Sequence, residues 1–130
     1  MMKFILILTL GFGAWSIGSF LFGGTKCPSE KVKGKTETEL IRFARSVYDN
    51  VKSGRTRDFA AQVMDLKSSG LKESYDYLKY IALADDPEWI VEKRSGIEGY
   101  FVTFKTPGGN RSYILVGEKN NQWKFTCAGQ

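Results

Sequence analysis

Two cysteines are the side chains of this 130-residue sequence whose type and position point most directly to covalent chemistry. They are Cys27 and Cys127, and most of the chain lies between them. An even pair placed in this way predicts a disulfide, a bond that persists in oxidising compartments. In the chain-entropy model, closing a loop of about 100 residues stabilises a fold by roughly 4–5 kcal/mol. The alternative is that the two thiols are unrelated and separately buried.

The side chains that most often carry out catalysis are scarce. The sequence contains no histidine, which excludes histidine-based triads, histidine general bases and histidine metal ligands. Two distant cysteines do not make a four-ligand zinc site. The acidic residues Asp85, Asp86 and Glu88 lack the spacing of a calcium loop and favour a turn around Pro87. We therefore predict no catalytic residue, no metal site and no cofactor, and hence a protein that is not an enzyme.

The formal net charge of +5 raises the question of nucleic-acid binding. Asp49 and Asp58 interrupt the basic residues that lie closest together, and no nucleic-acid-binding motif accompanies them. A solvated helix face accounts for these residues better, so we expect no nucleic-acid partner. The basic residues in question are Arg42, Arg45, Arg55 and Arg57.

Residues 4–24 contain no charged side chain, and Lys3 and Lys26 lie on either side of them. About 20 mostly apolar residues in helical form cross the hydrocarbon core of a bilayer. We therefore predict an N-terminal transmembrane helix, with residues 1–25 as an uncleaved single-pass membrane anchor. The alternatives are a cleaved signal peptide, for which the apolar stretch is long, and a lipoprotein with its lipid on Cys27.

Small residues recur in this segment at a spacing that favours the packing of two membrane helices. Ala14 and Gly18, and likewise Ser19 and Gly23, are four residues apart, as in small-xxx-small motifs. The alternative is simply that glycine is common in membrane helices.

Two patterns in the sequence conflict over the side of the membrane on which the C-terminal part lies. The lysines that follow the apolar segment, from Lys26 to Lys35, favour the cytoplasm by the positive-inside rule. The pair of Cys27 and Cys127 favours an oxidising compartment. We give the cysteines more weight and predict an extracytoplasmic domain, either periplasmic or at the cell surface.

The rest of the chain predicts a polar basic stalk over residues 26–35 and one soluble α+β domain over residues 36–130. Apolar residues at helical spacing predict three helices, at about residues 37–52, 56–68 and 71–83. After Pro87 the pattern changes to strands at residues 89–93, 100–106, 112–117 and 123–128, separated by short turns. We expect the three helices to pack on one face of a curved four-stranded antiparallel meander.

Both faces of this predicted sheet carry apolar side chains. If Thr106 lies opposite Arg111, one face carries the five residues Tyr100, Val102, Phe104, Tyr113 and Leu115. Helices on one side cover one face only, and an apolar face that they leave free marks an interaction site. We predict that these five residues form a protein interface. The alternatives are that they belong to the core, or that a slip or bulge changes their grouping.

The strand run from Gly99 to Phe125, GYFVTFKTPGGNRSYILVGEKNNQWKF, resembles the nuclear transport factor 2-like superfamily. Members of this superfamily have a cone-shaped α+β fold that often ends in a strand like Trp123-Lys124-Phe125. The resemblance implies an assembly or scaffold domain, as in the membrane-anchored members, or a small-ligand pocket as in the enzymes.

The hypothesis that these observations favour is a membrane-anchored accessory or assembly subunit that binds a protein partner, or its own copy, through its sheet and its membrane helix. A second hypothesis is a ligand-binding or weakly catalytic cone with Tyr75, Asp76 or Tyr80 pointing inward. A third is an envelope inhibitor or immunity-type protein.

Overall fold

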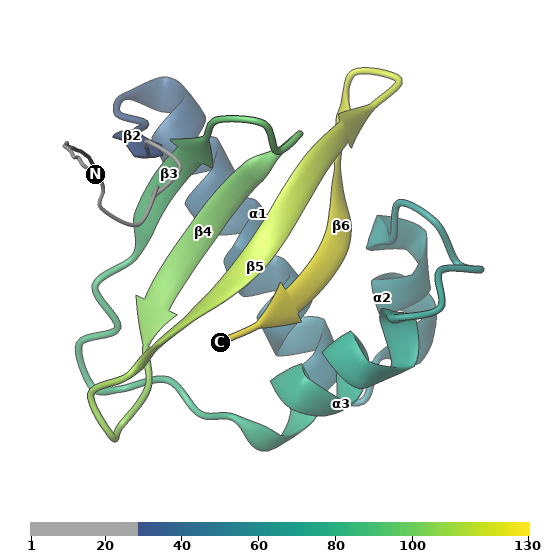
Figure 1. The fold of residues 1–130 in the computed structure, drawn as a ribbon. Helices are drawn as coiled ribbons and strands as arrows, with labels where there is room; N and C mark the ends of the chain where they lie inside the picture. The colour runs from purple at the N-terminus through teal and green to yellow at the C-terminus, as the bar shows by residue number, and fades with distance from the viewer. Residues whose placement is uncertain (1–28) are drawn as a thin grey trace, which may run out of the picture.

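The computed structural model describes residues 29–130, which form three helices and one five-stranded antiparallel sheet of order β2-β3-β4-β5-β6 (Figure 1). Each strand of the sheet is followed along the chain by its neighbour in space, and the helices are inserted between β2 and β3. The elements are β2 (Ser29–Lys31), α1 (Lys35–Lys52), α2 (Thr56–Gln62), α3 (Leu71–Tyr80), β3 (Ile90–Arg94), β4 (Tyr100–Lys105), β5 (Arg111–Lys119) and β6 (Gln122–Gly129).

The longest of these helices, α1, is amphipathic. Leu40, Ala44, Val47 and Val51 recur at a spacing of three or four residues, so they lie on one stripe of the helix, and all four are buried. The helix ends at Lys52, where Gly54 adopts a positive φ of 71°. The apolar stripe therefore explains both the helix and its docking onto the sheet.

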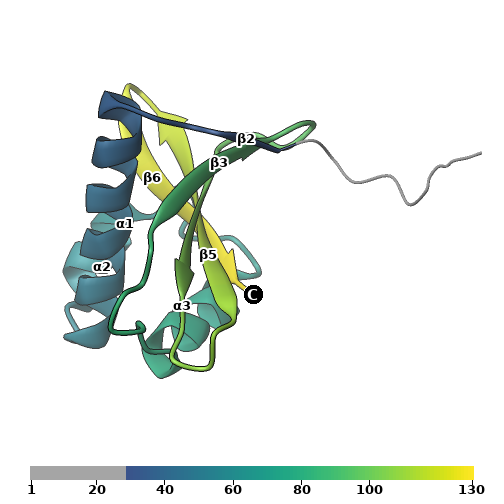
Figure 2. The same cartoon turned by 90° about the vertical axis from the view of Figure 1, so that its left-hand side faces the viewer.

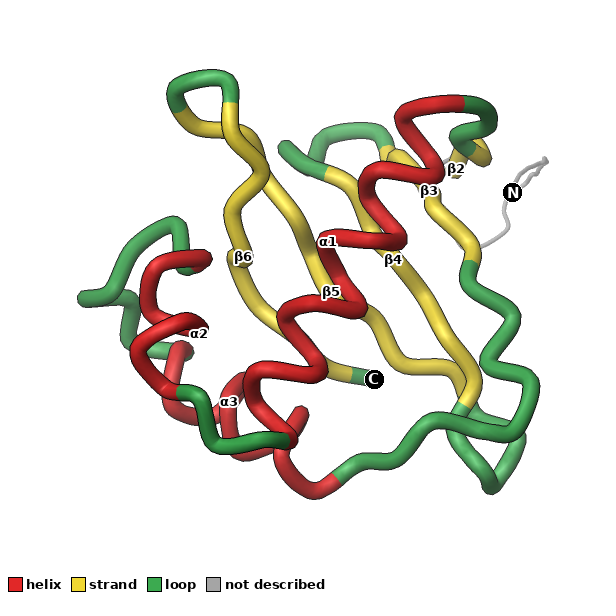
Figure 3. Tube along the Cα trace, turned by 180° about the vertical axis from the view of Figure 1, so that it is seen from behind, coloured by secondary structure: helices red, strands yellow, loops and turns green. Residues whose placement is uncertain are grey.

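Figure 3 shows α1 lying across one face of the sheet, with α2 and α3 near the β6 edge. The core lies between α1 and the sheet, and its largest fully buried side chains include Phe104, Phe125, Leu40, Leu78 and Ile114. The helix α2 ends earlier than the sequence pattern predicts, because Val63 turns to an extended conformation and forms a bridge with Phe125. The edge of β6 is thereby partly covered.

The pairing of β4 with β5 differs by one residue from the simplest register. Phe104 lies opposite Ser112 and Val102 opposite Ile114, because five residues, 106–110, connect the two strands. The pairing of β5 with β6 has a bulge next to Leu115, so Val116 lies opposite Phe125 but Leu115 lies opposite Cys127. A shift of one residue moves a side chain to the other face of the sheet.

The predicted fold class is wrong in its number of strands. The sheet has five strands and not four, because Ser29–Lys31 pairs with β3 through the register Ser29↔Arg94 and Lys31↔Glu92. These three residues belong to the segment that we expected to form a polar stalk. All three are exposed and polar, so no alternation of apolar and polar residues marks them as a strand.

The predicted transmembrane helix is also corrected. None of the helices in residues 29–130 combines the length and the apolar composition that a membrane crossing needs. The longest, α1, has charged residues such as Arg42, Arg45 and Asp49 along its exposed side. The segment expected to span the membrane, residues 4–24, lies outside the described residues.

Candidate functional site

The face of the sheet that points away from α1 is the candidate site, and we call it the outer face. Within residues 29–130, the helices lie on the other side of the sheet or at its β6 edge, as Figure 2 shows. Alternation along the strands brings together on the outer face Arg94 of β3, Phe101 of β4, Tyr113 and Leu115 of β5, and Cys127 of β6.

The structure does not bring together the five residues predicted as an interface. Tyr113 and Leu115 lie on the outer face, where both are half-buried. Val102 and Phe104 lie on the opposite face, in the core, and have no exposed surface. Tyr100 also lies on the helix side, with its ring 5.7 Å from that of Trp123. The prediction that these five residues share one face of the sheet is wrong, because the β4–β5 loop shifts the register of the two strands by one residue.

Sequence reasoning missed Phe101, in the middle of the outer face, and Arg94, at the end of β3 next to the edge strand β2. Phe101 is only 6% exposed, although no helix in the described part of the chain covers it. The Arg94 guanidinium stacks over its ring, with Cζ 4.1 Å from the ring centre, and the Tyr113 ring packs edge-on at 5.2 Å. Cation–π stacking and edge-to-face aromatic packing each contribute favourably to such arrangements. The outer face therefore has an ordered surface layer of arginine and tyrosine.

The Cys127 thiol lies beside Tyr113 on this face. Burial raises the pKa of Cys127, and a hydrogen bond with Tyr113 partly offsets that rise. Burial also raises the pKa of Tyr113, and the proximity of Cys127 raises it further. Both groups are therefore protonated at neutral pH, and the thiol is a poor nucleophile there.

The other cysteine of the predicted disulfide, Cys27, lies outside the described residues. Ser29, two residues later, is on β2 at one edge of the sheet, whereas Cys127 is on β6, four strand spacings away. Those spacings amount to about 19 Å, whereas two extended residues and a disulfide together reach only about 14 Å. An intrachain bond between Cys27 and Cys127 would thus require β2 to leave β3. The disulfide remains a prediction.

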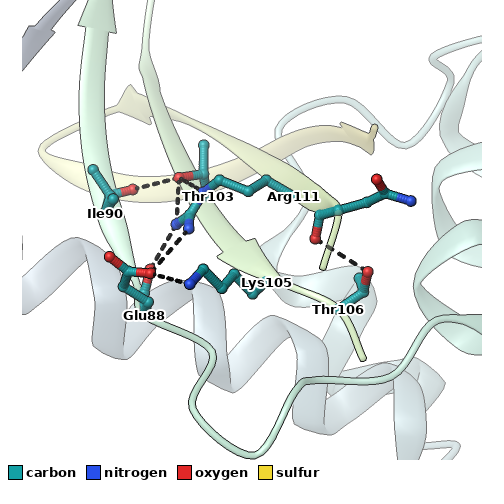
Figure 4. A network of polar contacts seen from close by, with 7 residues as sticks. Glu88, Ile90, Thr103, Lys105, Thr106 and Arg111 are labelled. Carbon is teal, nitrogen blue, oxygen red and sulfur yellow. Dashed lines mark hydrogen bonds and ion pairs between the residues drawn. The ribbon is translucent and has the colours of Figure 1, made fainter. Parts of the chain in front are cut away.

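A network of charged and polar groups holds the margin of the outer face (Figure 4). Glu88 pairs with Lys105 at 2.7 Å and with Arg111 at 3.6 Å, and Arg111 also donates a hydrogen bond to the Glu88 carbonyl at 2.6 Å. Arg111 donates further hydrogen bonds to Thr103 Oγ1, which in turn donates to the Ile90 carbonyl. A hydrogen bond from Lys105, together with the charges of Lys105 and Arg111, lowers the pKa of the Glu88 carboxyl. Arg111 is thus committed to contacts within the fold.

A groove of about 520 Å³ adjoins Arg94, between β2 and the turn that joins β3 to β4. Ile97, in this turn, is one of the few large apolar side chains that are exposed, at 39%. Of its charged lining residues, Arg94 lies on the outer face, whereas Lys93 and Glu30 lie opposite each other on the helix side, with Lys93 Nζ 4.8 Å from the Tyr100 ring centre. The groove therefore places Arg94 next to an exposed apolar side chain.

The residues that a catalytic cone would use do not converge. The Tyr75 ring packs on Phe59 at 5.2 Å, Asp76 pairs with Lys72 at 2.8 Å on the surface of α3, and Tyr80 is 81% exposed. Across residues 29–130, no group of three histidine, cysteine, aspartate or glutamate side chains is placed to hold a metal ion.

The four residues predicted to pack membrane helices, Ala14, Gly18, Ser19 and Gly23, lie outside the described residues. Comparison with models of known protein families, with curated proteins and with solved structures gave no match. The resemblance to the nuclear transport factor 2-like superfamily and the extracytoplasmic location therefore remain predictions.

Proposed function

We propose that residues 29–130 form a protein-binding domain, an accessory or assembly subunit that contacts its partner through the outer face. The observation that supports this proposal is a sheet face with an apolar, aromatic cluster, Phe101, Tyr113 and Leu115, to which no helix of the described chain is docked. An antiparallel sheet with one solvated face normally alternates apolar and polar residues. Here the outer-facing positions of β4 and β5 instead include Phe101, Tyr113 and Leu115.

The composition of the outer face supports binding to a protein. Arginine and tyrosine are enriched among the residues that contribute most to protein–protein binding. Arg94 and Tyr113 are held in place by their contacts with Phe101, so ordering them costs little on binding. A surface whose side chains are already ordered is well suited to recognise one partner geometry.

The experiment compares Tyr113→Asp with Leu66→Asp in the full chain, tagged and expressed in its own organism. Leu66 is a matched control, because it is apolar and 62% exposed but lies in the connection between α2 and α3 and not on a strand of the sheet. We expect Tyr113→Asp to abolish co-purification of a partner and Leu66→Asp to leave it unchanged. Circular dichroism checks that both variants are folded. Equal recovery of the partner with a folded Tyr113→Asp variant would contradict the proposal.

A further inference from the structure

We infer that Arg94 binds a carboxylate of the partner, and that the partner is an acidic surface of a different protein. This inference rests on the proposed function and specifies the chemistry of the partner. Three observations support it: the position and order of Arg94, the groove beside it, and the balance of charges around it.

Arg94 is oriented for recognition. Its guanidinium carbon Cζ lies 4.1 Å from the ring centre of Phe101, while its side chain is still 37% exposed. Its ion pair with Glu92 is long, at 3.5 Å, so it uses few of the five donors of an arginine. A guanidinium fixed in this way presents a planar fork that matches a carboxylate in two hydrogen bonds.

The surroundings of Arg94 combine positive charge with apolar contact area. Lys31 of β2 lies opposite Glu92 and therefore on the same face as Arg94, and the groove beside Arg94 contains the exposed Ile97. Across the sheet, Leu115 and Tyr113 provide half-buried apolar surface. An acidic side chain flanked by apolar ones therefore complements this surface in both charge and hydrophobicity.

A second copy of this chain complements the surface poorly. Cations outnumber carboxylates on the outer face and its margin, where Lys31, Arg94, Lys105 and Arg111 lie with Glu92 and Glu88. In a two-fold dimer the same patch faces itself, so each Arg94 would face a basic surface. The residues that precede Ser29 are also unsuitable, because residues 1–28 contain lysine but no aspartate or glutamate.

The test is to purify the tagged full chain from its own cells and to measure how much partner protein co-purifies. Mass spectrometry identifies the partner. Four chains are compared: the wild type, Arg94→Glu, Arg94→Gln and the control Arg57→Glu. Arg57 is exposed on α2, outside the outer face. We expect Arg94→Glu to lower retention by about tenfold or more and Arg94→Gln by less, since the first reverses the charge and the second only removes it. Arg57→Glu should stay within about twofold of the wild type.

A substitution in the partner completes the test. Replacing the contacting aspartate or glutamate by lysine should restore its binding to Arg94→Glu. Retention within about twofold for both folded Arg94 variants would overturn the inference. If Arg94→Glu fails to fold, as judged by its thermal melt, Arg94→Gln decides, because it keeps a polar side chain of similar reach.

Two outcomes separate this inference from the proposed function. Capture of a differently tagged copy of this same chain, lost with Tyr113→Asp, would overturn the acidic partner but keep the outer face as an interface. Retention that neither Arg94→Glu nor Tyr113→Asp changes would overturn both.

Discussion

At the scale of single residues, the side chains of the outer face contact one another, and these contacts change their burial and their pKa values. Tyr113 contacts Phe101 by its ring and Cys127 by its hydroxyl, and Arg94 covers Phe101 from the other side. Of these, the sequence predicted Tyr113 as an interface residue and Cys127 as a partner in a disulfide. It did not identify Phe101 or Arg94, because their roles depend on which strand positions lie opposite each other.

The pairing of Tyr113 with Cys127 gives a prediction about thiol reactivity. The hydrogen bond from Tyr113 lowers the Cys127 pKa against the larger effect of burial. Tyr113→Phe removes that bond, so the pKa should rise further and less thiolate should be present at any given pH. We expect alkylation of Cys127 to become slower and its pH midpoint to move upward. The rate is measured against pH in a Cys27→Ser background, and an unchanged or lower midpoint would contradict the assignment.

The ion pairs of Glu88 predict how stability depends on pH. Its pKa is lowered chiefly by Lys105, so the folded state favours the ionised carboxylate. The resulting stabilisation is present above the unfolded-state pKa and is lost as pH falls through the folded-state pKa. We expect the free energy of unfolding to fall between about pH 7 and about pH 3 by less in Glu88→Gln than in the wild type. Urea titrations at several pH values measure this, and parallel curves would refute the prediction.

At the scale of elements, the spacing of apolar residues in the sequence predicted those helices and strands whose formation depends on the local pattern alone. The spacing of Leu40, Ala44, Val47 and Val51 predicted α1 within two residues at its start, because a helix with one apolar stripe needs no information from distant residues. The strand β2 could not be predicted in this way. It has three exposed polar residues, and only its pairing with β3 makes it a strand.

The register of the strands was also predicted wrongly from the sequence. The loop of residues 106–110 and the bulge next to Leu115 each shift side chains by one position. Loop geometry and bulges depend on how the twisted sheet packs onto α1, which residue types alone do not specify. The predicted interface was therefore divided between the two faces.

Phe104 and Tyr113, which the sequence placed on one face, should therefore differ in their effect on stability. Phe104 is fully buried against Trp89 and Tyr48, whereas Tyr113 is half-buried on the outer face. Phe104→Ala should lower the free energy of unfolding by about 3–5 kcal/mol. We expect Tyr113→Ala to lower it by clearly less, since its site is open to solvent. Denaturant unfolding of both variants measures the difference, and similar losses would argue against the observed register.

At the scale of the whole molecule, the arrangement is one layer of helix on one layer of sheet, with the second face of the sheet left open within residues 29–130 (Figure 2). The open face has an apolar centre, an ordered arginine and a basic margin. Binding of an acidic partner there would cover the apolar residues and pair the arginine. The protein-binding role proposed for this chain follows from that arrangement.

Site-specific photo-cross-linking in the native host tests this role most directly. A photoreactive residue replaces Leu115 on the outer face in one chain and Leu66, in the connection between α2 and α3, in another. We predict that position 115 cross-links to one defined partner protein and that position 66 does not. A chain that cross-links from neither position, or equally from both, would contradict the assignment of the outer face as the binding surface.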